Sequence, residues 1–237
     1  MSRHQQIVCR NCGNTGHGNF CAWCGEKYAA VKITLASLIH QVVHFFTHFD
    51  KGFAYTVNQL IKAPGEMQRK YIDGFRSKHQ KPFQFFFVCG TISGLGYYFI
   101  IVAKSKLFGS SDAVEEDFFR HYFVLLQAAM LPLYACVLWL IFIRSKYNYA
   151  EILVLILYNL GFVFLVLIPI NVLNLVFTHF DTRYLEVIFL LFYNTITNLR
   201  FFINSPKWII VLKTILILAI IYTASQVVSD IARGILK

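Results

Sequence analysis

Charged side chains are scarce in this sequence. They make up 14% of its 237 residues, against about a quarter in ordinary soluble domains. Hydrophobic residues reach 57%, aromatic residues reach 17%, and Phe alone occurs 24 times. A soluble fold of this length has no need of so much apolar surface. The composition therefore excludes that class and indicates an integral membrane protein.

The first thirty residues lack the apolar core that a secretory signal peptide needs. They carry Cys, Asn and Gly instead. We therefore expect no cleavable leader, and insertion through the first long hydrophobic segment of the chain itself.

A catalytic constellation is missing as well. The sequence has no Ser/His/Asp motif, no glycine-rich phosphate loop after a strand and no pair of carboxylates within a hydrophobic segment. His121, close to Glu116 and Asp117, could contribute to a site that modifies lipids. Acids at this position are more typical of a solvated helix start, where they face the positive end of the helix dipole. The pattern favours a non-enzymatic protein, and a lipid-modifying enzyme is the weakest alternative.

Five hydrophobic segments are long enough to cross a bilayer, which takes roughly 20 apolar residues as a helix. They are residues 83–103, 122–143, 150–178, 184–203 and 206–229. The first follows Pro82, a favoured first helical residue. The third contains Pro169, Asn171 and Asn174, so a kink or partial re-entry is an alternative to full crossing. We predict an all-α integral membrane protein with a five-helix transmembrane bundle over residues 83–237.

Basic residues define the predicted orientation. Residues 1–82 hold eleven Lys or Arg and four Asp or Glu, and so carry +7 of the net charge of +10. Arg144 and Lys146 follow the second segment, while Arg200 and Lys207 flank the turn after the fourth. Lys and Arg accumulate on the cytoplasmic side of membrane proteins. We therefore expect a cytoplasmic N-terminus and a C-terminus outside.

Four cysteines form a paired motif near the N-terminus. Two residues separate Cys9 from Cys12 and Cys21 from Cys24, and a glycine follows each pair. In a Cys-x-x-Cys-Gly knuckle, two thiolates reach one ion while backbone amides point at the sulfurs. Two knuckles make a tetrahedral site with no open position for water. We predict a structural Zn²⁺ site in a zinc ribbon over residues 1–28.

Other interpretations of the four cysteines are weaker. Iron in a rubredoxin-like site is the chemical alternative. Two disulfides are disfavoured because the N-terminus is expected on the reducing, cytoplasmic side. Nucleic-acid binding is disfavoured because the nearby basic residues are few and scattered. A ribbon this small has no core, so the metal supplies its folding energy, and we expect Phe20, Trp23 and Tyr28 to pack on it or on a neighbour. The favoured role is a rigid platform for protein contact.

Residues 29–82 are predicted to form an amphipathic juxtamembrane segment. Apolar residues recur at three- and four-residue steps from Leu35 to Phe53, which is typical of a helix lying in the membrane interface. A second short helix is expected over "EMQRKYID", ending at Gly74. Basic residues cluster just before the first span, and we favour anchoring at anionic headgroups over a specific lipid or acidic-partner site.

Three histidines lie on one face of this segment. His40, His44 and His48 are spaced four residues apart, and two histidines at that spacing can hold a metal. Since no carboxylate stands beside them at ligand spacing, a polar stripe facing the cytosol or a partner is the favoured interpretation.

Residues 50–82, which follow the histidines, contain a pattern of spaced Gly, Pro, aromatic and polar residues. Its positions are Asp50, Gly52, Phe53, Thr56, Leu60, Pro64, Gly65, Tyr71, Gly74, Arg76 and Pro82. Together with the cysteine motif, this pattern resembles a bacterial membrane family known as domain of unknown function 3667. The resemblance covers roughly residues 9–83, and the sequence departs from it at Glu26 and His79, where Gln and Tyr are common. It implies a zinc ribbon, several spans and a bacterial inner-membrane location, and it brings no established activity.

Amides are the main polar groups within the predicted spans. Asn159, Asn171 and Asn174 lie in the third, and Asn194 and Asn198 in the fourth. Amides within a membrane commonly pair one helix with another, although these asparagines could also line a polar path. No acid lies clearly at mid-membrane, which weakens the case for proton-coupled transport.

Small residues mark one face of the first predicted span. Gly90 and Gly94 form a Gly-x-x-x-Gly pattern, extended by Ser93 and Gly96. Such a face allows another helix to approach closely, and we favour a helix of the same chain over a partner.

The sequence as a whole predicts a non-enzymatic accessory or scaffold subunit of an inner-membrane protein complex. We expect it to contact membrane lipids and either a membrane-protein partner or a second copy of the chain, and to bind no nucleic acid. A small transporter or oligomeric channel is the main alternative.

Overall fold

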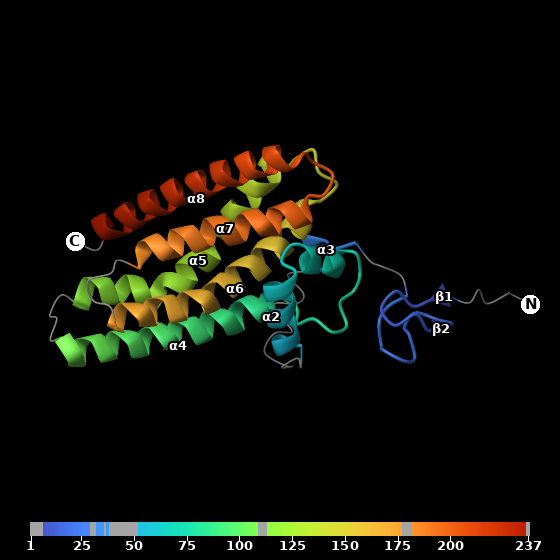
Figure 1. Ribbon diagram of the computed structural model, residues 1–237, viewed down its shortest axis with the longest axis horizontal. Helices are drawn as coiled ribbons and strands as arrows, with labels where there is room; N and C mark the ends of the chain where they lie inside the picture. The colour runs from blue at the N-terminus through green and yellow to red at the C-terminus, as the bar shows by residue number, and fades with distance from the viewer. Residues whose placement is uncertain are drawn as a thin grey trace, which may run out of the picture.

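The computed structural model describes residues 7–28, 32–35, 37, 52–108, 113–176 and 182–235. Within these residues the chain forms a small head (residues 7–28), two short helices and a bundle of long helices (Figure 1). The head contains strands β1 (Ile7–Val8) and β2 (Thr15–Gly16), and the short helices are α2 (Phe53–Lys62) and α3 (Glu66–Ile72). The long helices are α4 (Pro82–Phe108), α5 (Ala113–Ile141), α6 (Tyr149–Val176), α7 (Arg183–Phe201) and α8 (Lys207–Ile235). The head lies beyond the end of the bundle that carries α2 and α3 (Figure 1).

The long helices lie where the five hydrophobic segments predict them. α4 begins at Pro82, and α6 stays helical through Pro169 as far as Val176. Three of the helices contain stretches long and apolar enough to cross a membrane: Pro82–Lys104, Tyr149–Leu173 and Lys207–Ala224. The described residues therefore form a mostly helical protein with three candidate membrane-crossing helices.

Helices α5 and α7 are not among these three. In α5, side chains are described only from Gln127 onward, and the described part contains the shorter apolar stretch Gln127–Ile141. α7 has 19 residues, and these include Glu186 and Arg200. Crossing by all five helices stays a prediction.

Helix α6 is the centre of the bundle. The side chains of Ile152, Leu157 and Tyr158 are completely buried, and α4 packs along α6 more extensively than any other pair of described helices. A Cβ atom added at Gly161 of α6 would lie 3.0 Å from the ring of Phe85. The glycine therefore allows α4 to approach closely.

The small-residue face of α4 is only partly used in this contact. A Cβ at Gly96 would lie 3.2 Å from Ile168 of α6, whereas a Cβ at Gly94 would meet nothing within 4 Å. Packing against another helix of the chain is confirmed at Gly96. Our expectation that Gly94 faces a neighbouring helix of the chain is wrong, because Gly94 faces open space.

Asparagine side chains connect neighbouring helices inside the bundle. Asn159 donates to the Asn194 carbonyl oxygen at 2.7 Å, joining α6 to α7, and Asn198 donates to the Thr214 hydroxyl at 3.0 Å, joining α7 to α8. Asn171 donates to Glu186 at 2.9 Å. The amides that the structure describes thus pair helices, as the favoured interpretation predicts. The side chain of Asn174 lies outside the described residues.

The two short helices pack against one end of the bundle. The short helix predicted over "EMQRKYID" is present as α3, which contacts α6 and α7 and buries Met67 and Tyr71. Residues 38–51 lie outside the described part, and with them most of the predicted amphipathic stretch. The position of these helices in the membrane interface stays a prediction.

Candidate metal centre

The head is built from two hairpins with the same backbone pattern. The Cys9 N–H donates to the Asn14 carbonyl at 2.8 Å, and the Gly13 N–H donates to the Cys9 carbonyl at 2.9 Å. The second hairpin repeats both bonds at the same lengths around Cys21. Gly13 and Gly25 have φ angles of 75° and 72°, in the left-handed region that favours glycine. This is the local structure that the repeated Cys-x-x-Cys-Gly motif predicts.

Backbone amides of the hairpins point at the sulfur atoms. The N–H of Cys24 bonds the sulfur of Cys21 and is the largest cause lowering the pKa of that thiol to about 6. The N–H of Glu26 likewise lowers the pKa of Cys24. At Cys12 an amide also lowers the pKa, but burial and the three neighbouring thiols raise it to about 12. Cys21 and Cys24 therefore lose their protons more readily than Cys12.

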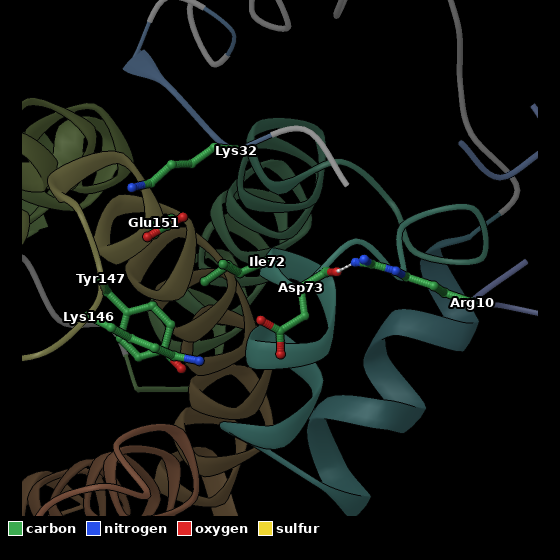
Figure 2. Close-up of a pocket in the computed structure, with 7 residues that line it drawn as sticks. All are labelled: Arg10, Lys32, Ile72, Asp73, Lys146, Tyr147 and Glu151. Atoms are coloured by element: carbon green, nitrogen blue, oxygen red, sulfur yellow. Dashed lines mark hydrogen bonds between the residues drawn. The ribbon is translucent and has the colours of Figure 1, made fainter. Parts of the chain in front are cut away.

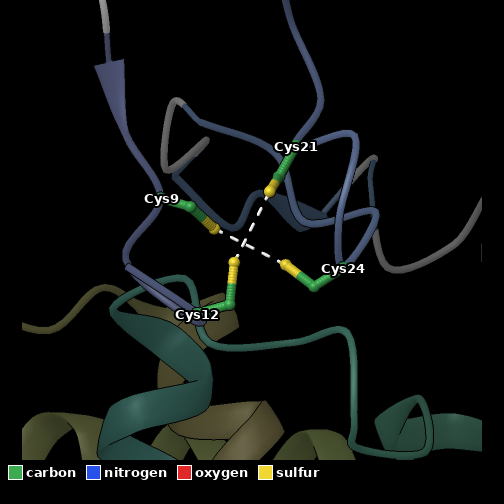
Figure 3. A group of neighbouring side chains, drawn as sticks. All are labelled: Cys9, Cys12, Cys21 and Cys24. Atoms are coloured by element: carbon green, nitrogen blue, oxygen red, sulfur yellow. Dashed lines mark hydrogen bonds between the residues drawn. The ribbon is translucent and has the colours of Figure 1, made fainter. Parts of the chain in front are cut away.

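The four sulfur atoms all lie within 4.8 Å of one another. The Cys9–Cys24 and Cys12–Cys21 pairs are both 3.5 Å apart, and Figure 3 shows the four side chains converging on one point. A tetrahedral ion with metal–sulfur bonds of about 2.3 Å requires sulfurs about 3.8 Å apart, so the set fits a single ion. A disulfide requires about 2.05 Å, and all four cysteines are free.

The four cysteines are therefore positioned to bind a metal ion. An ion held by all four would cross-link the two hairpins and leave no ligand position open. This arrangement stabilises structure and offers no site for a substrate on the metal.

The aromatic residues of the head differ in their packing. Tyr28 is buried against Cys9 and Cys21, and a Cβ at Gly16 would collide with its hydroxyl. Phe20 and Trp23 are 56% and 80% exposed. Packing on the cysteine cluster is confirmed for Tyr28. Phe20 and Trp23 do not pack on it, because the compact hairpins leave no interior large enough for them, and their packing on a neighbour stays a prediction.

Glu26 docks the head onto the rest of the protein. Its side chain is 7% exposed, and its Oε2 atom accepts hydrogen bonds from the backbone N–H groups of Arg76 at 3.0 Å and Ser77 at 2.7 Å. The amide of Asn11 donates to the Ser77 hydroxyl at 2.7 Å. The head is thus held by side chains next to its cysteines, on the loop that follows α3.

Two arginines meet at the C-terminal end of α3. Arg76 donates to the carbonyls of Tyr71 at 3.0 Å and Ile72 at 3.2 Å, and Arg10 of the head donates to the carbonyl of Asp73 at 3.4 Å. Cations at this end of a helix are favourable because its last carbonyls are otherwise unpaired.

The loop after α3 is fastened to α2 and α6. The Thr56 hydroxyl donates to the Gly52 carbonyl at 2.8 Å and accepts from the Gln80 N–H at 3.0 Å. The Tyr158 hydroxyl of α6 donates to the Gln80 carbonyl. A Cβ at Gly52 would lie 2.8 Å from the Lys78 carbonyl oxygen, so a larger residue would push the loop away. We call residues 52–81 the juxtamembrane unit.

Gly65 fits the turn between α2 and α3 against α7. It has a φ of 79°, and a Cβ there would collide with the Thr197 carbonyl oxygen. The Gln68 side chain accepts from the Gly65 N–H at 2.5 Å, and Arg200 of α7 donates to the Lys62 carbonyl at 3.1 Å. The Pro-Gly turn therefore combines a left-handed backbone with close contact to the bundle.

His79 lies at the centre of the juxtamembrane unit. Its ring is 5.0 Å from the ring of Tyr55 and 6.2 Å from that of Tyr71. Burial lowers its pKa to about 4, against the opposing effect of the Glu26 carboxylate. The imidazole is therefore neutral near pH 7.

Other residues singled out by the sequence are not brought to this site. His40, His44 and His48 lie outside the described residues, as do the side chains of Glu116, Asp117 and His121. Conversely, sequence reasoning missed the docking contacts of Asn11, Glu26 and Ser77. The only signal for Glu26 was its departure from the family pattern.

Comparisons with known proteins support one part of this picture. Residues 50–94 match a family model described as Protein of unknown function (DUF3667), which confirms the resemblance over that segment. No curated protein matches the chain, and no solved structure does. The matched residues contain the whole juxtamembrane unit and the first part of α4.

Proposed function

We propose that this chain, whose residues 50–94 match the DUF3667 family, is a non-enzymatic accessory or scaffold subunit of a bacterial inner-membrane protein complex. A Zn²⁺ ion cross-links its head, which contacts a membrane-protein partner or a second copy of the chain. The five long helices anchor it in the lipid as a multi-pass protein, with the N-terminus in the cytoplasm and the C-terminus outside. Nucleic acid is not among the partners.

The main support for this proposal is that different residues of the head contact the juxtamembrane unit and face the solvent. Glu26 and Asn11 attach the head to the juxtamembrane unit. Val8, Phe20 and Trp23 remain 59%, 56% and 80% exposed. Exposed aromatic residues on a small rigid structure are typical of a protein contact surface. The head is thus held at one place and has apolar side chains free for a partner at another.

Charge supports the proposed orientation. Helix α5 ends, and α6 and α8 begin, at the end of the bundle that carries the juxtamembrane unit (Figure 1). Arg144, Lys146 and Lys207 lie at these helix ends. Basic residues next to membrane spans favour the cytoplasmic side, which supports a cytoplasmic head.

The ligand set supports Zn²⁺. Four cysteine thiolates in a tetrahedral arrangement suit zinc or iron. Zinc has no redox chemistry and provides the purely structural role that a closed ligand shell implies.

A polar transport path has weaker support. Asn171, Asn194 and Asn198 use their amide groups in hydrogen bonds to neighbouring helices or to their own helix backbone. In a transporter, these amides would have to contact the solute instead. We therefore expect no solute flux that depends on these three side chains.

The test is purification of the tagged protein in a gentle detergent at native expression, followed by mass spectrometry of co-eluting proteins. Three forms are compared: the wild type, a Phe20→Ser/Trp23→Ser variant and an Ile61→Ser variant. Ile61 is 62% exposed on α2, so its substitution removes exposed apolar surface away from the head.

We expect one stoichiometric membrane-protein companion, or a second copy of the chain, with the wild type and with Ile61→Ser. The association should be lost with Phe20→Ser/Trp23→Ser while metal content is unchanged. A solitary wild-type protein would contradict the scaffold proposal, as would a companion that all three forms retain equally.

A further inference from the structure

A cavity of about 280 Å³ lies between the head and the base of the bundle. Its floor is formed by Ile72 of α3 and by Tyr147 and Glu151 around the start of α6. These three side chains are only 8%, 7% and 6% exposed. The rim carries Arg10, Lys32, Asp73 and Lys146. Figure 2 shows these side chains on the head, on the segment that carries Lys32, at the end of α3 and around the start of α6.

The floor offers a hydrogen-bond donor that the protein does not use. The Tyr147 hydroxyl is buried and has no hydrogen-bond partner within the described residues. Burial is the largest cause raising the pKa of Tyr147 to about 12, so its oxygen keeps its proton and remains a donor. A buried polar group without a partner is costly. The hydroxyl has almost no accessible surface, so an acceptor atom of a ligand would remove that cost once a shift of the ring turned the hydroxyl toward the cavity.

The carboxylate on the floor is already engaged. Glu151 Oε2 accepts from the Asn148 N–H at 2.9 Å, and Asn148 Oδ1 accepts from the Glu151 N–H at 2.9 Å. This reciprocal pair caps the N-terminus of α6, where a negative charge is favourable. The negative charge of Glu151 is therefore stabilised by the N-terminus of α6.

The rim provides cations from three different segments. Arg10, Lys32 and Lys146 form no ion pair within the described part of the chain, since the only pair found there joins Lys70 to Glu66. The side-chain amide of Asn148 donates a hydrogen bond to the carbonyl of Ile33 at 3.1 Å. This bond positions the segment that carries Lys32. The cations are thus gathered around the cavity without being neutralised by the carboxylates beside them.

A fourth cation adjoins the floor. The Nη1 atom of Arg69 is buried without a hydrogen-bond partner among the described residues, and its charge acts on Tyr147. The lining cations outnumber Asp73 and Glu151 by three to two, and Arg69 adds to this excess. At the Tyr147 hydroxyl the carboxylates of Asp73 and Glu151 act against Arg69, so binding of an anion in the cavity depends on the three lining cations.

We propose that this cavity binds a phosphate group, through the Tyr147 hydroxyl and the cationic side chains of Arg10, Lys32 and Lys146. A phosphate has several acceptor oxygens in a tetrahedral arrangement, and so it can meet donors that approach from several directions. Arg10 uses one N–H for the Asp73 carbonyl and keeps others available.

The position of the cavity makes a membrane lipid the first source to test. Tyr147 lies two residues before Tyr149, where a candidate membrane-crossing stretch begins. A phospholipid headgroup would lie at this depth, with its acyl chains along the bundle. A soluble phosphate ester from the cytoplasm offers the same chemistry, and the experiment must separate the two.

The experiment measures ligand binding to the full-length protein in detergent by native mass spectrometry. Phosphatidylglycerol is compared with diacylglycerol of the same acyl chains, which lacks the phosphate. Glycerol 3-phosphate is compared with glycerol as the soluble pair. We expect one phosphatidylglycerol per chain and no retention of diacylglycerol.

Four variants test the residues named. Lys32→Gln/Lys146→Gln should weaken binding by about tenfold or more, and Tyr147→Phe by several-fold, because each removes a donor to an anionic group. Asp73→Asn removes a negative charge from the rim and should strengthen binding. The control Lys27→Gln/Lys78→Gln makes the same change in net charge outside the cavity and should have little effect.

The compound that binds identifies the source of the phosphate group. Binding of phosphatidylglycerol identifies a lipid site, and binding of glycerol 3-phosphate alone identifies a site for a soluble phosphate ester. The proposal is overturned if neither phosphate compound binds. It is also overturned if the two lysine pairs have equal effects, or if Asp73→Asn weakens binding, because the interaction would then not be phosphate recognition in this cavity.

Discussion

The head and the bundle keep their shapes by different means. In the bundle, a continuous apolar core includes α3, α4, α6 and α7, and α6 alone buries a run of large side chains. In the head, the buried cluster consists of Cys9, Cys21 and Tyr28, with Cys24 packed beside it. Two cysteines and one tyrosine bury too little apolar surface to offset the conformational entropy of ordering two hairpins. The bundle thus has an apolar core, whereas the small buried cluster of the head leads us to predict that the head depends on a metal ion held by its cysteines.

The juxtamembrane unit joins these two regions and shares features of both. It buries Leu60, Met67 and Tyr71 as the bundle does. Towards the head it presents backbone N–H groups and a hydroxyl, which Glu26 and Asn11 bind. A polar contact of this kind can break without unfolding either neighbour.

Loss of a ligand should have the largest effect and should be confined to the head. We expect Cys21→Ser to abolish metal binding and unfold the head, because classical zinc-binding modules are unfolded without their metal. The helical content of the bundle should not change. Metal content per chain, measured by elemental analysis, and circular dichroism check this.

Cys136→Ser is the matched control, since Cys136 lies in α5, far from the cluster in sequence. It should keep one metal ion per chain. Equal metal content in the two serine variants would show that the cysteine cluster is not the metal site.

Substitution of two glycines by alanine compares the packing of the juxtamembrane unit with that of the bundle surface. Gly65→Ala should lower the stability of the protein by about 2 kcal/mol or more, because a left-handed backbone is strained for Ala and the new Cβ meets the Thr197 carbonyl. Gly94→Ala enters open space in a helix and should be neutral or slightly stabilising. Thermal unfolding in detergent compares the two. Similar melting temperatures for both variants would show that the turn does not pack on α7 as described.

Glu26 tests the contact between the head and the juxtamembrane unit. Glu26→Ala leaves the N–H groups of Arg76 and Ser77 without their acceptor, at a cost of about 1–3 kcal/mol. Glu26→Gln keeps an acceptor oxygen and should cost less. Hydrogen exchange at Arg76 and Ser77 should be fastest in the Ala variant, intermediate in the Gln variant and slowest in the wild type, with metal content equal in all three. Unchanged exchange in the Ala variant would contradict the docking contact.

The smallest expected effect is the pH dependence at His79. Its folded-state pKa of about 4 lies below the usual value of about 6.5 in an unfolded chain. The unfolded state therefore binds the proton first, and the contribution of His79 to stability is present above pH 6.5 and lost as the pH falls toward 4. His79→Phe should make the melting temperature less sensitive to pH over this range. Acid also releases the metal from both proteins, so only the difference between their curves is informative, and parallel curves would exclude this role for His79.

Local patterns predicted the elements that depend on nearby residues. The spacing of the cysteines was enough to predict the four residues that converge, because each hairpin is built from one short motif. Hydrophobic length and Pro82 predicted where the long helices lie. Gly74 predicted the end of α3, and its φ of 113° shows why glycine is required there.

Contacts between distant segments could not be predicted in this way. Glu26 bonds Arg76 and Ser77, which lie about fifty residues away in the sequence. The spacing of apolar residues along the chain does not predict contacts between such distant segments. Packing of Trp23 on the cysteine cluster was wrongly allowed for a related reason: hydrophobicity favours burial, but the head has no interior in which to bury so large a ring. The cavity beside Tyr147 combines the head, α3 and the start of α6, so it exists only once these parts are assembled.

The most direct test of the account is hydrogen exchange along the full-length protein in detergent, before and after removal of the metal by a chelator. We predict that amides of residues 7–28 lose their protection, while those of α2, α3 and α6 keep theirs. A head that stays protected after the metal is gone would contradict the central claim that the metal, and not a core of its own, holds the head in shape.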